Sequence, residues 1–393
     1  MANTNKTIDY ITKEVLRIAH EKATFLGTID RQYDSEFGKK GMKVGDTIRI
    51  RTPEKGTIRT GRVAQVQDSA ETNTTLTVST QKGFDLAFNG AEATLDLDDY
   101  VERKIKPRMA NLISAIESEV LQGATKQIYQ VAGTAGTPPT DLAAFGAARA
   151  KLNQQAVPKD DLRSIQLDSV TMGGLVNAFR SQQNPTKDIS QAFREGFIER
   201  TSMADWYENE RVWTMTNGTD VTSVTLDTYT VIQGDADLTV TGFATPTAGM
   251  VFTIAGVFDV HPETKAAYSH LKQFVILEGS TATNLLISPA IYSTGKDQNV
   301  SALPTTTAAL VFIGAASTSY VQNLMYHKEF ATFAVADLPL HAGADRCVRQ
   351  THEGLSFRVW QDADIINDQE ILRVDILYGW KVLRPDWAVR ITS

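Results

Sequence analysis

The segment LRVDILYGWKVLRPDWAVRI, residues 372–391, is the most regular two-faced stretch of the sequence. Every second residue from Leu372 to Val382 is apolar or aromatic. This alternation is typical of a β-strand with one buried face. Pro385 interrupts it, because proline cannot donate to a strand ladder, and the alternation resumes out of phase up to Ile391. Chain ends usually fray unless a sheet holds them, so we expect this segment to be built into one sheet.

The composition is that of a soluble globular protein with more than one core. The 393 residues are 42% hydrophobic and 22% charged, and no apolar run approaches the ~18–20 residues of a transmembrane helix. Cys347 is the only cysteine, which excludes a disulfide framework and a multi-cysteine metal site. The start of the chain lacks the pattern of a secretory signal. A net charge of -7 argues against a general nucleic-acid coat but leaves room for a local basic patch.

The first part of the chain predicts a short helix and then a long hairpin. Apolar residues at helical spacing mark residues 8–20, with Thr7 as a candidate N-cap. A turn cluster at 52–56 separates a strand pattern around 47–51 from an expected return strand at 58–66. A hairpin alone is only marginally stable in water. We therefore expect the hairpin over 42–90 to pack against a partner.

A long amphipathic helix is expected over residues 95–122. Its apolar face recurs at steps of three and four, from Leu97 to Val120. Such a helix would be about 40 Å long, much longer than the usual ~11–12 residues. Pro107 lies inside the pattern and is expected to kink the helix.

The middle of the chain changes character twice. Residues 133–139 are expected to form a loop, Thr140 to cap a helix, and residues 163–179 to form a strand followed by a helix. From 212 to about 320, threonines and turns are frequent and short strand patterns recur every 8–12 residues or so, which indicates a small barrel or sandwich. An all-β block between α+β segments indicates an inserted domain.

Three stretches carry a family resemblance: MVFTIAGVFDVHPETK at 250–265, NLMYHKEFATFAVADLPL at 323–340 and the segment from Leu355 to Ile391. Together with the order of elements, they make the chain resemble the major capsid proteins of tailed phages. It is most similar to the coat proteins of short-tailed phages that carry an inserted β domain, the I-domain. The fold class implied is α+β, an HK97-type capsid fold with an inserted all-β, barrel-like domain.

The resemblance also implies domain boundaries. They are an N-terminal arm at 1–41, an extended loop at 42–90, a peripheral domain with the spine helix at 91–137 and 351–393, an axial domain at 138–212 and 321–350, and the inserted β domain at 213–320. In this scheme the C-terminal strands belong to the sheet beside the spine helix.

The implied function is self-assembly into hexamers and pentamers of an icosahedral shell around packaged double-stranded DNA. The main partner would be the chain itself, with a separate scaffolding protein, because the sequence begins almost at the arm, and a portal. DNA would be touched only weakly and without specificity, a decoration protein is left open, and no membrane is involved. The protein would be assembled in the host cytoplasm and reside in the virion capsid.

Two oppositely charged segments are the candidate inter-subunit site. The basic set is Lys43, Arg49, Arg51, Lys55, Arg59 and Arg62, which gives the hairpin a net +4 over residues 42–62. The acidic set, at the start of the long helix, is Glu92, Asp96, Asp98 and Asp99. One interpretation is purely local: a solvated hairpin, and acids that complement a helix N-terminus. The other is that the hairpin of one subunit lies on the acidic segment of its neighbour. A third use of the basic set, phosphate binding, lacks interleaved aromatic residues.

Catalytic and metal-binding patterns are not found in the sequence. The six histidines lack metal spacing, and no phosphate loop or nucleophile elbow occurs. We therefore expect no enzyme activity, no cofactor and no metal. Two alternatives stay open: another HK97-type shell protein, such as that of an encapsulating compartment, and an enzyme with a β-rich insert.

Overall fold

The computed structural model describes residues 11–19, 23–32, 47–52, 56, 61–64, 66, 72–89, 101–179, 204–219, 221–228, 230–341, 343, 346–352, 355–364 and 369–393. The chain divides into two compact units. The first unit comprises residues 1–51, 73–120 and 331–381, and the second comprises 52–72, 121–330 and 382–393. Each is described in turn.

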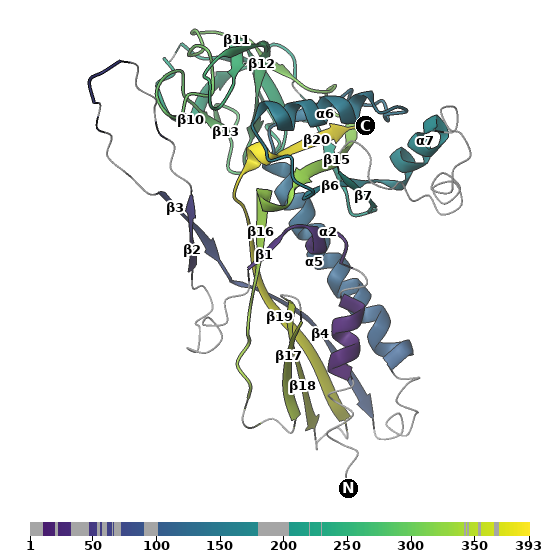
Figure 1. The fold of residues 1–393 in the computed structure, drawn as a ribbon. Coiled ribbons are helices and arrows are strands. Elements are labelled where there is room, and N and C mark those ends of the chain that lie inside the picture. Colours follow the sequence, from purple (N-terminus) through teal and green to yellow (C-terminus); the bar gives the residue numbers. More distant parts are fainter. Residues whose placement is uncertain are drawn as a thin grey trace. The chain divides into compact units, whose positions relative to one another are not determined.

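The first unit is built on a six-stranded sheet (Figure 1). Its helices and strands are a helical stretch at 11–19, α2 (Phe25–Thr28), β1 (Asp30–Gln32), β2 (Thr47–Thr52), β3 (Thr72–Thr77), β4 (Thr80–Asn89), a π-helical turn (Val101–Ile105), the greater part of α5 (Lys106–Lys126), β16 (Ala331–Ala336), β17 (Arg346–His352), β18 (Leu355–Asp364) and β19 (Gln369–Val382). The strand order is β1-β16-β19-β18-β17, and β4 also pairs with β19.

The long helix is confirmed from Val101 onward and continues to Lys126, beyond its predicted end at 122. Helix α5 runs from Lys106 to Lys126 and directly follows the π-helical turn. Its predicted face is buried, since Met109, Ile116 and Val120 are 0% exposed. Pro107 is the second residue of α5 and lies inside the continuous helical stretch that begins with the π-helical turn at Val101. The predicted place of the proline inside the long helix is therefore confirmed, the kink stays a prediction, and residues 95–100 lie outside the described part.

The hairpin has a different return strand from the one expected. Strand β2 pairs with β3, at Thr72–Thr77, whereas residues 61–64 and 66 are not in a strand. The physical reason is burial. Leu76 and Val78 join a buried cluster against which Ile50 packs, while Val63 and Val66 are 80% and 93% exposed.

The C-terminal segment is divided between two sheets. Strand β19 contains the predicted alternation and lies inside the sheet of the first unit, with Leu372, Val374 and Ile376 buried. The opposite face is not uniformly exposed, because Asp375 and Leu377 are also buried. After the 3-10 turn at Pro385–Trp387, β20 (Ala388–Thr392) joins the sheet of the second unit. Our expectation that both strands share one sheet is wrong, because the turn redirects the chain between its two apolar runs.

The host part of the second unit is a second six-stranded sheet with two helices. Its further elements are β5 (Val131–Gly133), α6 (Ala143–Gln154), β6 (Arg163–Leu167), α7 (Ser169–Phe179), β7 (Asp205–Glu208), β8 (Trp213–Thr216), β15 (Ser319–His327) and a 3-10 turn (Lys328–Phe330). The order is β5-β20-β15-β6-β7, with β8 also on β15. The strand and helix predicted over 163–179 are confirmed. Thr140 does not cap α6; the Ala143 N–H instead donates to the nearer Asp141 carboxylate at 2.9 Å.

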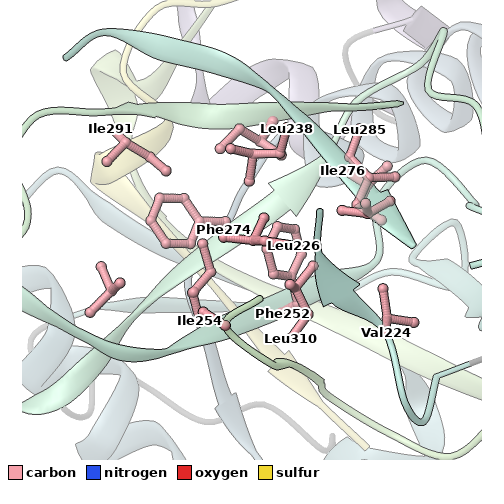
Figure 2. Packing of buried hydrophobic residues seen from close by; sticks show 14 of the residues in the cluster. Val224, Leu226, Leu238, Phe252, Ile254, Phe274, Ile276, Leu285, Ile291 and Leu310 are labelled. Atoms are coloured by element: carbon pink, nitrogen blue, oxygen red, sulfur yellow. The ribbon is translucent and has the colours of Figure 1, made fainter. Parts of the chain in front are cut away.

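The inserted domain is confirmed as an all-β unit. Its strands are β9 (Thr225–Leu226), β10 (Asp235–Thr241), β11 (Val251–Val260), β12 (Ala267–Ile276), β13 (Asn284–Ile291) and β14 (Leu310–Phe312). They follow the order β14-β11-β12-β13-β10-β9, and a bridge between Thr225 and Ala309 closes the sheet on itself. Figure 2 shows the core that this closure encloses, with Phe252 and Phe274 near its centre. The centroids of these two rings are 5.8 Å apart. The predicted barrel-like form agrees with this closure.

Candidate functional site

The ten predicted inter-subunit residues lie largely outside the described part of the structure. Arg49 and Arg51 belong to β2, although their side chains are not described, and Arg62 is exposed. Outside the described residues lie Lys43, Lys55, Arg59, Glu92, Asp96, Asp98 and Asp99. The predicted contact between the basic and acidic segments therefore stays a prediction.

The described part of the extended loop presents apolar side chains to solvent. Val63 and Val66 are the two most exposed large hydrophobic residues of the described chain, next to the exposed Arg62. A single exposed apolar residue needs no explanation. Two in one loop of basic sequence, however, are apolar side chains that another protein can cover.

A groove of about 550 Å³ lies on one face of the first unit's sheet. It is lined by Ile371, Trp360 and Ala87, by the carboxylates of Asp85 and Asp362, and by Arg373. Arg373 lies 3.7 Å from Asp85. The indole N–H of Trp360 is buried and has no acceptor among the described residues. The groove therefore combines apolar side chains with two carboxylates and one arginine, Arg373, which pairs with Asp85.

Two carboxylates of α5 hold the first unit together. The buried Glu117 accepts hydrogen bonds from the Thr24 hydroxyl at 2.8 Å and the Phe25 N–H at 2.9 Å, which fixes the N-terminal segment on the helix. Glu119 accepts from Lys82 of β4 and from the Tyr378 hydroxyl of β19 at 2.9 Å. Burial, followed by this hydrogen bond, raises the pKa of Tyr378. The long helix is thus tied by polar contacts as well as by its apolar face.

A buried polar junction joins the inserted domain to its host within the second unit. At its centre Asp259 of β11 accepts from Lys272 of β12 at 2.8 Å and from Gln155 of the host at 3.2 Å. Lys272 is 2% exposed, and His270 lies 3.4 Å from the same carboxylate. A buried ion pair is stable only when its remaining hydrogen bonds are satisfied, and the host amide of Gln155 supplies one of them.

Lys151 of α6 forms the second contact of the junction. Its ammonium donates to the Val131 carbonyl and to the Gln273 side-chain oxygen, both at 2.6 Å. The same Gln273 oxygen accepts from the Val131 N–H at 2.9 Å. Burial lowers the pKa of Lys151 to about 8, while the nearby Asp259 opposes this effect. One lysine and one glutamine thus connect α6, β5 and β12.

Arg390 of β20 forms the third contact of the junction. It is 0% exposed and donates to the Gly249 carbonyl at 2.6 Å and to the carbonyl of Lys126, the last residue of α5, at 3.1 Å. Its guanidinium lies over the Trp213 ring. Gly249 has φ +95, and a Cβ there would lie 2.3 Å from Trp213 Cη2. Only glycine is accommodated at this position.

The sequence analysis missed every residue of this junction. The available signal was weak: Asp259 is a lone carboxylate in an otherwise apolar strand, and Arg390 alternates with Val389 and Ile391 as a solvent-facing residue would. Neither pattern says that a second domain covers the polar side. Long-range pairing of β11 with β12, and of β20 with β15 and β5, buries these charges.

The junction has the chemistry of a structural contact. Within the described residues, no group of three or more His, Cys, Asp or Glu side chains could hold a metal ion. The expected absence of a metal and a cofactor stays a prediction. None of the described helices is both long enough and apolar enough to cross a membrane.

Comparison with known proteins finds one family over the whole chain. Residues 1–392 match the family model described as P22 coat protein, gene protein 5. No curated protein matches the sequence. Among solved structures, Mycobacterium phage Che8 aligns at 13% identity over 94% of this chain and 90% of that one, with a TM-score of 0.49. The capsid of Ralstonia phage GP4 aligns at 9% identity over 95% and 91%, with a TM-score of 0.48. The CUS-3 coat protein I-domain aligns at 26% identity over 24% of this chain and 96% of that one, with a TM-score of 0.20.

Proposed function

Because the chain belongs to the P22 coat protein family, and is therefore a major capsid protein of a tailed phage that forms a shell, we propose that its copies assemble as hexamers and pentamers. These would close an icosahedral shell around packaged double-stranded DNA. The observation that carries the proposal is the family match over residues 1–392. The resemblance drawn from the sequence is confirmed by that match, and so is the fold class, an α+β fold of HK97 type with an inserted all-β domain.

The extended loop is the element that we propose to bridge copies. It exposes Val63 and Val66 and carries the basic set that begins at Lys43. Its acceptor on a neighbouring copy would be the acidic segment from Glu92 to Asp99, and the groove beside Asp85 is a second candidate acceptor. Exposed ion pairs contribute only ~0–1 kcal/mol each. They would set the register and select the right partner more than they would hold the shell together.

Closure of the shell would compensate for weak single contacts. Once most subunits are in place, the last contacts form at high effective concentration. We further propose that a separate scaffolding protein and a portal take part, that assembly occurs in the host cytoplasm, and that DNA is contacted only weakly. The net charge of -7 favours weak contact, because a shell that releases its DNA gains nothing from binding it tightly.

Negative-stain microscopy of the full-length chain tests assembly directly. The chain is expressed with and without a candidate scaffolding protein from its own phage. Closed shells or polyheads are the expected result. Discrete small oligomers under both conditions, from folded protein, would contradict the proposal.

A charge-reversal pair tests the bridging loop. Arg49→Glu with Arg51→Glu is expected to block shell formation while circular dichroism of the monomer stays unchanged. Arg49→Lys with Arg51→Lys keeps the charge and serves as the matched control, which should still assemble. Adding Asp98→Lys and Asp99→Lys to the reversed loop should restore part of the assembly if the acidic segment is the acceptor. Normal shells from the variant with Arg49→Glu and Arg51→Glu alone would contradict the proposed contact, but they would not contradict the capsid function.

A further inference from the structure

A short segment after β16 is fastened to one face of the first unit's sheet. We call this segment, residues 337–341, the strap. Arg349 of β17 and Arg358 of β18 are cross-strand partners, so their side chains lie on the same face of the sheet. Arg349 donates to the Leu338 carbonyl at 3.2 Å, and Arg358 donates to the Pro339 carbonyl at 2.9 Å. Two arginines therefore hold the backbone of the strap.

The two ends of the strap are packed differently. Leu338 is 6% exposed and belongs to the buried cluster that contains Leu76 and Leu377. Leu340, in contrast, is 51% exposed, and His341, the last residue of the strap, is also exposed. The end of the strap can therefore open without uncovering the apolar core.

The contact between His341 and Arg358 requires a neutral histidine. His341 Nε2 lies 3.3 Å from Arg358 Nη1. A guanidinium has N–H donors and no acceptor, so Nε2 takes part only as an acceptor, without a proton. The imidazole ring also packs on the Trp360 ring, with the two centroids 4.6 Å apart. The neutral ring therefore closes the strap and covers part of Trp360.

The carboxylate beside Arg358 is already shared by two arginines. Arg358 is 5% exposed, and its Nη2 donates to the Asp375 carboxylate at 2.6 Å. Asp375 is 1% exposed and also accepts from Arg373 Nε at 2.9 Å. A protonated His341 would therefore add a further positive charge at a place where water screens charge poorly.

The other titratable and charged groups around the strap do not offset that charge. Asp337 pairs with Arg349, with 3.3 Å between the carboxylate and the guanidinium. Cys347 is the cross-strand partner of Trp360, and a thiol is uncharged in mild acid. Asp362 lines the groove beside Trp360 and is exposed, so water and salt screen its charge. These carboxylates are therefore either paired with an arginine or open to solvent.

We propose that His341 makes the end of the strap pH-sensitive: the strap is closed while the ring is neutral and opens when the ring is protonated. Protonation removes the acceptor at Nε2 and brings two cations into contact. Histidine is the side chain whose charge ordinarily changes between about pH 5 and 8. The closed strap binds fewer protons than the open strap, so it is favoured at neutral pH and is lost as the pH falls.

Opening of the strap changes one wall of the groove on this face of the sheet. Trp360 lines that groove of about 550 Å³, and it loses the cover of the imidazole ring when the strap opens. A molecule that binds the groove would therefore meet a larger aromatic surface in mild acid than at neutral pH. The inference concerns the folded subunit and does not depend on shell assembly.

The indole N–H signal of Trp360 in a nuclear magnetic resonance spectrum tests the state of the strap. The full-length chain is labelled with nitrogen-15 only in its five tryptophans and kept as a monomer, and Trp360→Phe assigns the signal. A neutral paramagnetic agent broadens the signals of accessible indole groups. In the wild-type chain the Trp360 signal should broaden more at about pH 5.5 than at about pH 7.5, because an opening equilibrium coupled to one proton gains up to about tenfold per pH unit. Equal broadening at the two pH values would overturn the proposal.

Two substitutions of His341 separate this histidine from other effects of acid. His341→Gln keeps a neutral acceptor in place of Nε2, so Trp360 should stay covered at both pH values. His341→Lys places a permanent cation beside Arg358, so Trp360 should be uncovered at both. His261→Gln, in the inserted domain, is the matched control and should respond to pH as the wild-type chain does. If His341→Gln opened in acid as the wild-type chain does, the response would come from another group and the proposal would be wrong.

Discussion

The inserted domain and the extended loop are opposite solutions to the burial of apolar side chains. In the inserted domain, Phe252, Phe274 and Leu285 are all 0% exposed, inside a sheet that closes on itself. In the loop, Val63 and Val66 are almost fully exposed. The hydrophobic effect favours removal of both kinds of surface from water. The insert is thus completed by its own chain, whereas we propose that the loop is completed by other molecules.

The largest expected effect is a break in the core of the inserted domain. Phe252→Ala removes a buried ring and should destabilise the inserted domain by about 3–5 kcal/mol, because a cavity adds to the lost transfer free energy. Hydrogen–deuterium exchange of β11 and β12 in the full-length chain measures it. Val311→Ala, at a 58% exposed position of the neighbouring β14, is the control and should change stability by less than about 0.5 kcal/mol. Equal exchange in both variants would mean that the core is not the source of the domain's stability.

An intermediate effect is expected at the junction, and it depends on pH. Burial holds the pKa of Lys151 at about 8 in the folded chain, below that of an unfolded lysine at about 10.4. Between these values the unfolded state binds more protons, so this group makes stability rise with pH. The wild-type chain should therefore gain stability relative to Lys151→Met from about pH 8 to 9.5. Midpoint temperatures measured across this range test the sign.

Two other groups define the useful window of that experiment. Tyr129 and Tyr378 have raised pKa values, so above about pH 10 unfolded tyrosines release protons and stability falls. Measurements below that pH therefore report the contribution of Lys151 to the pH dependence without that of the tyrosines. Parallel pH profiles of the midpoint temperature for the wild-type chain and Lys151→Met would show that burial does not lower the pKa of Lys151.

The smallest effect on the folded subunit is expected in the loop. Val63→Asp with Val66→Asp changes two exposed side chains, so the free energy of unfolding should move by less than about 0.5 kcal/mol. Shell formation should nevertheless be lost, because the substitution puts charge on a surface that we propose a neighbour to cover. Val63→Thr with Val66→Thr keeps the shape and is the milder control. If the aspartate pair assembles normally, these valines are not interface residues.

Local pattern was sufficient to predict the repeating elements. The three- and four-residue spacing predicted the buried face of α5, and the alternation of Leu372, Val374 and Ile376 predicted β19. Both follow from short-range geometry, because side-chain direction repeats with the period of the backbone. The turn-rich strands of the inserted domain were predicted for the same reason. The choice of the return strand was wrong, because Ile58 to Val66 and Thr72 to Thr77 both resemble strands, and only contact with Ile50 and its cluster distinguishes them.

The sequence by itself determined the class of the protein: an α+β chain with a long amphipathic helix, an all-β insert and the family resemblance that its motifs carry. Tertiary structure alone decided that the C-terminal segment is shared between two sheets and that Arg390 and Asp259 are buried at the junction. The physical reason is the range of the forces involved. The periodicity of the sequence indicates which side of an element is apolar. Whether the polar side is also buried depends on residues more than a hundred positions away, as it does for Arg390 and Gly249.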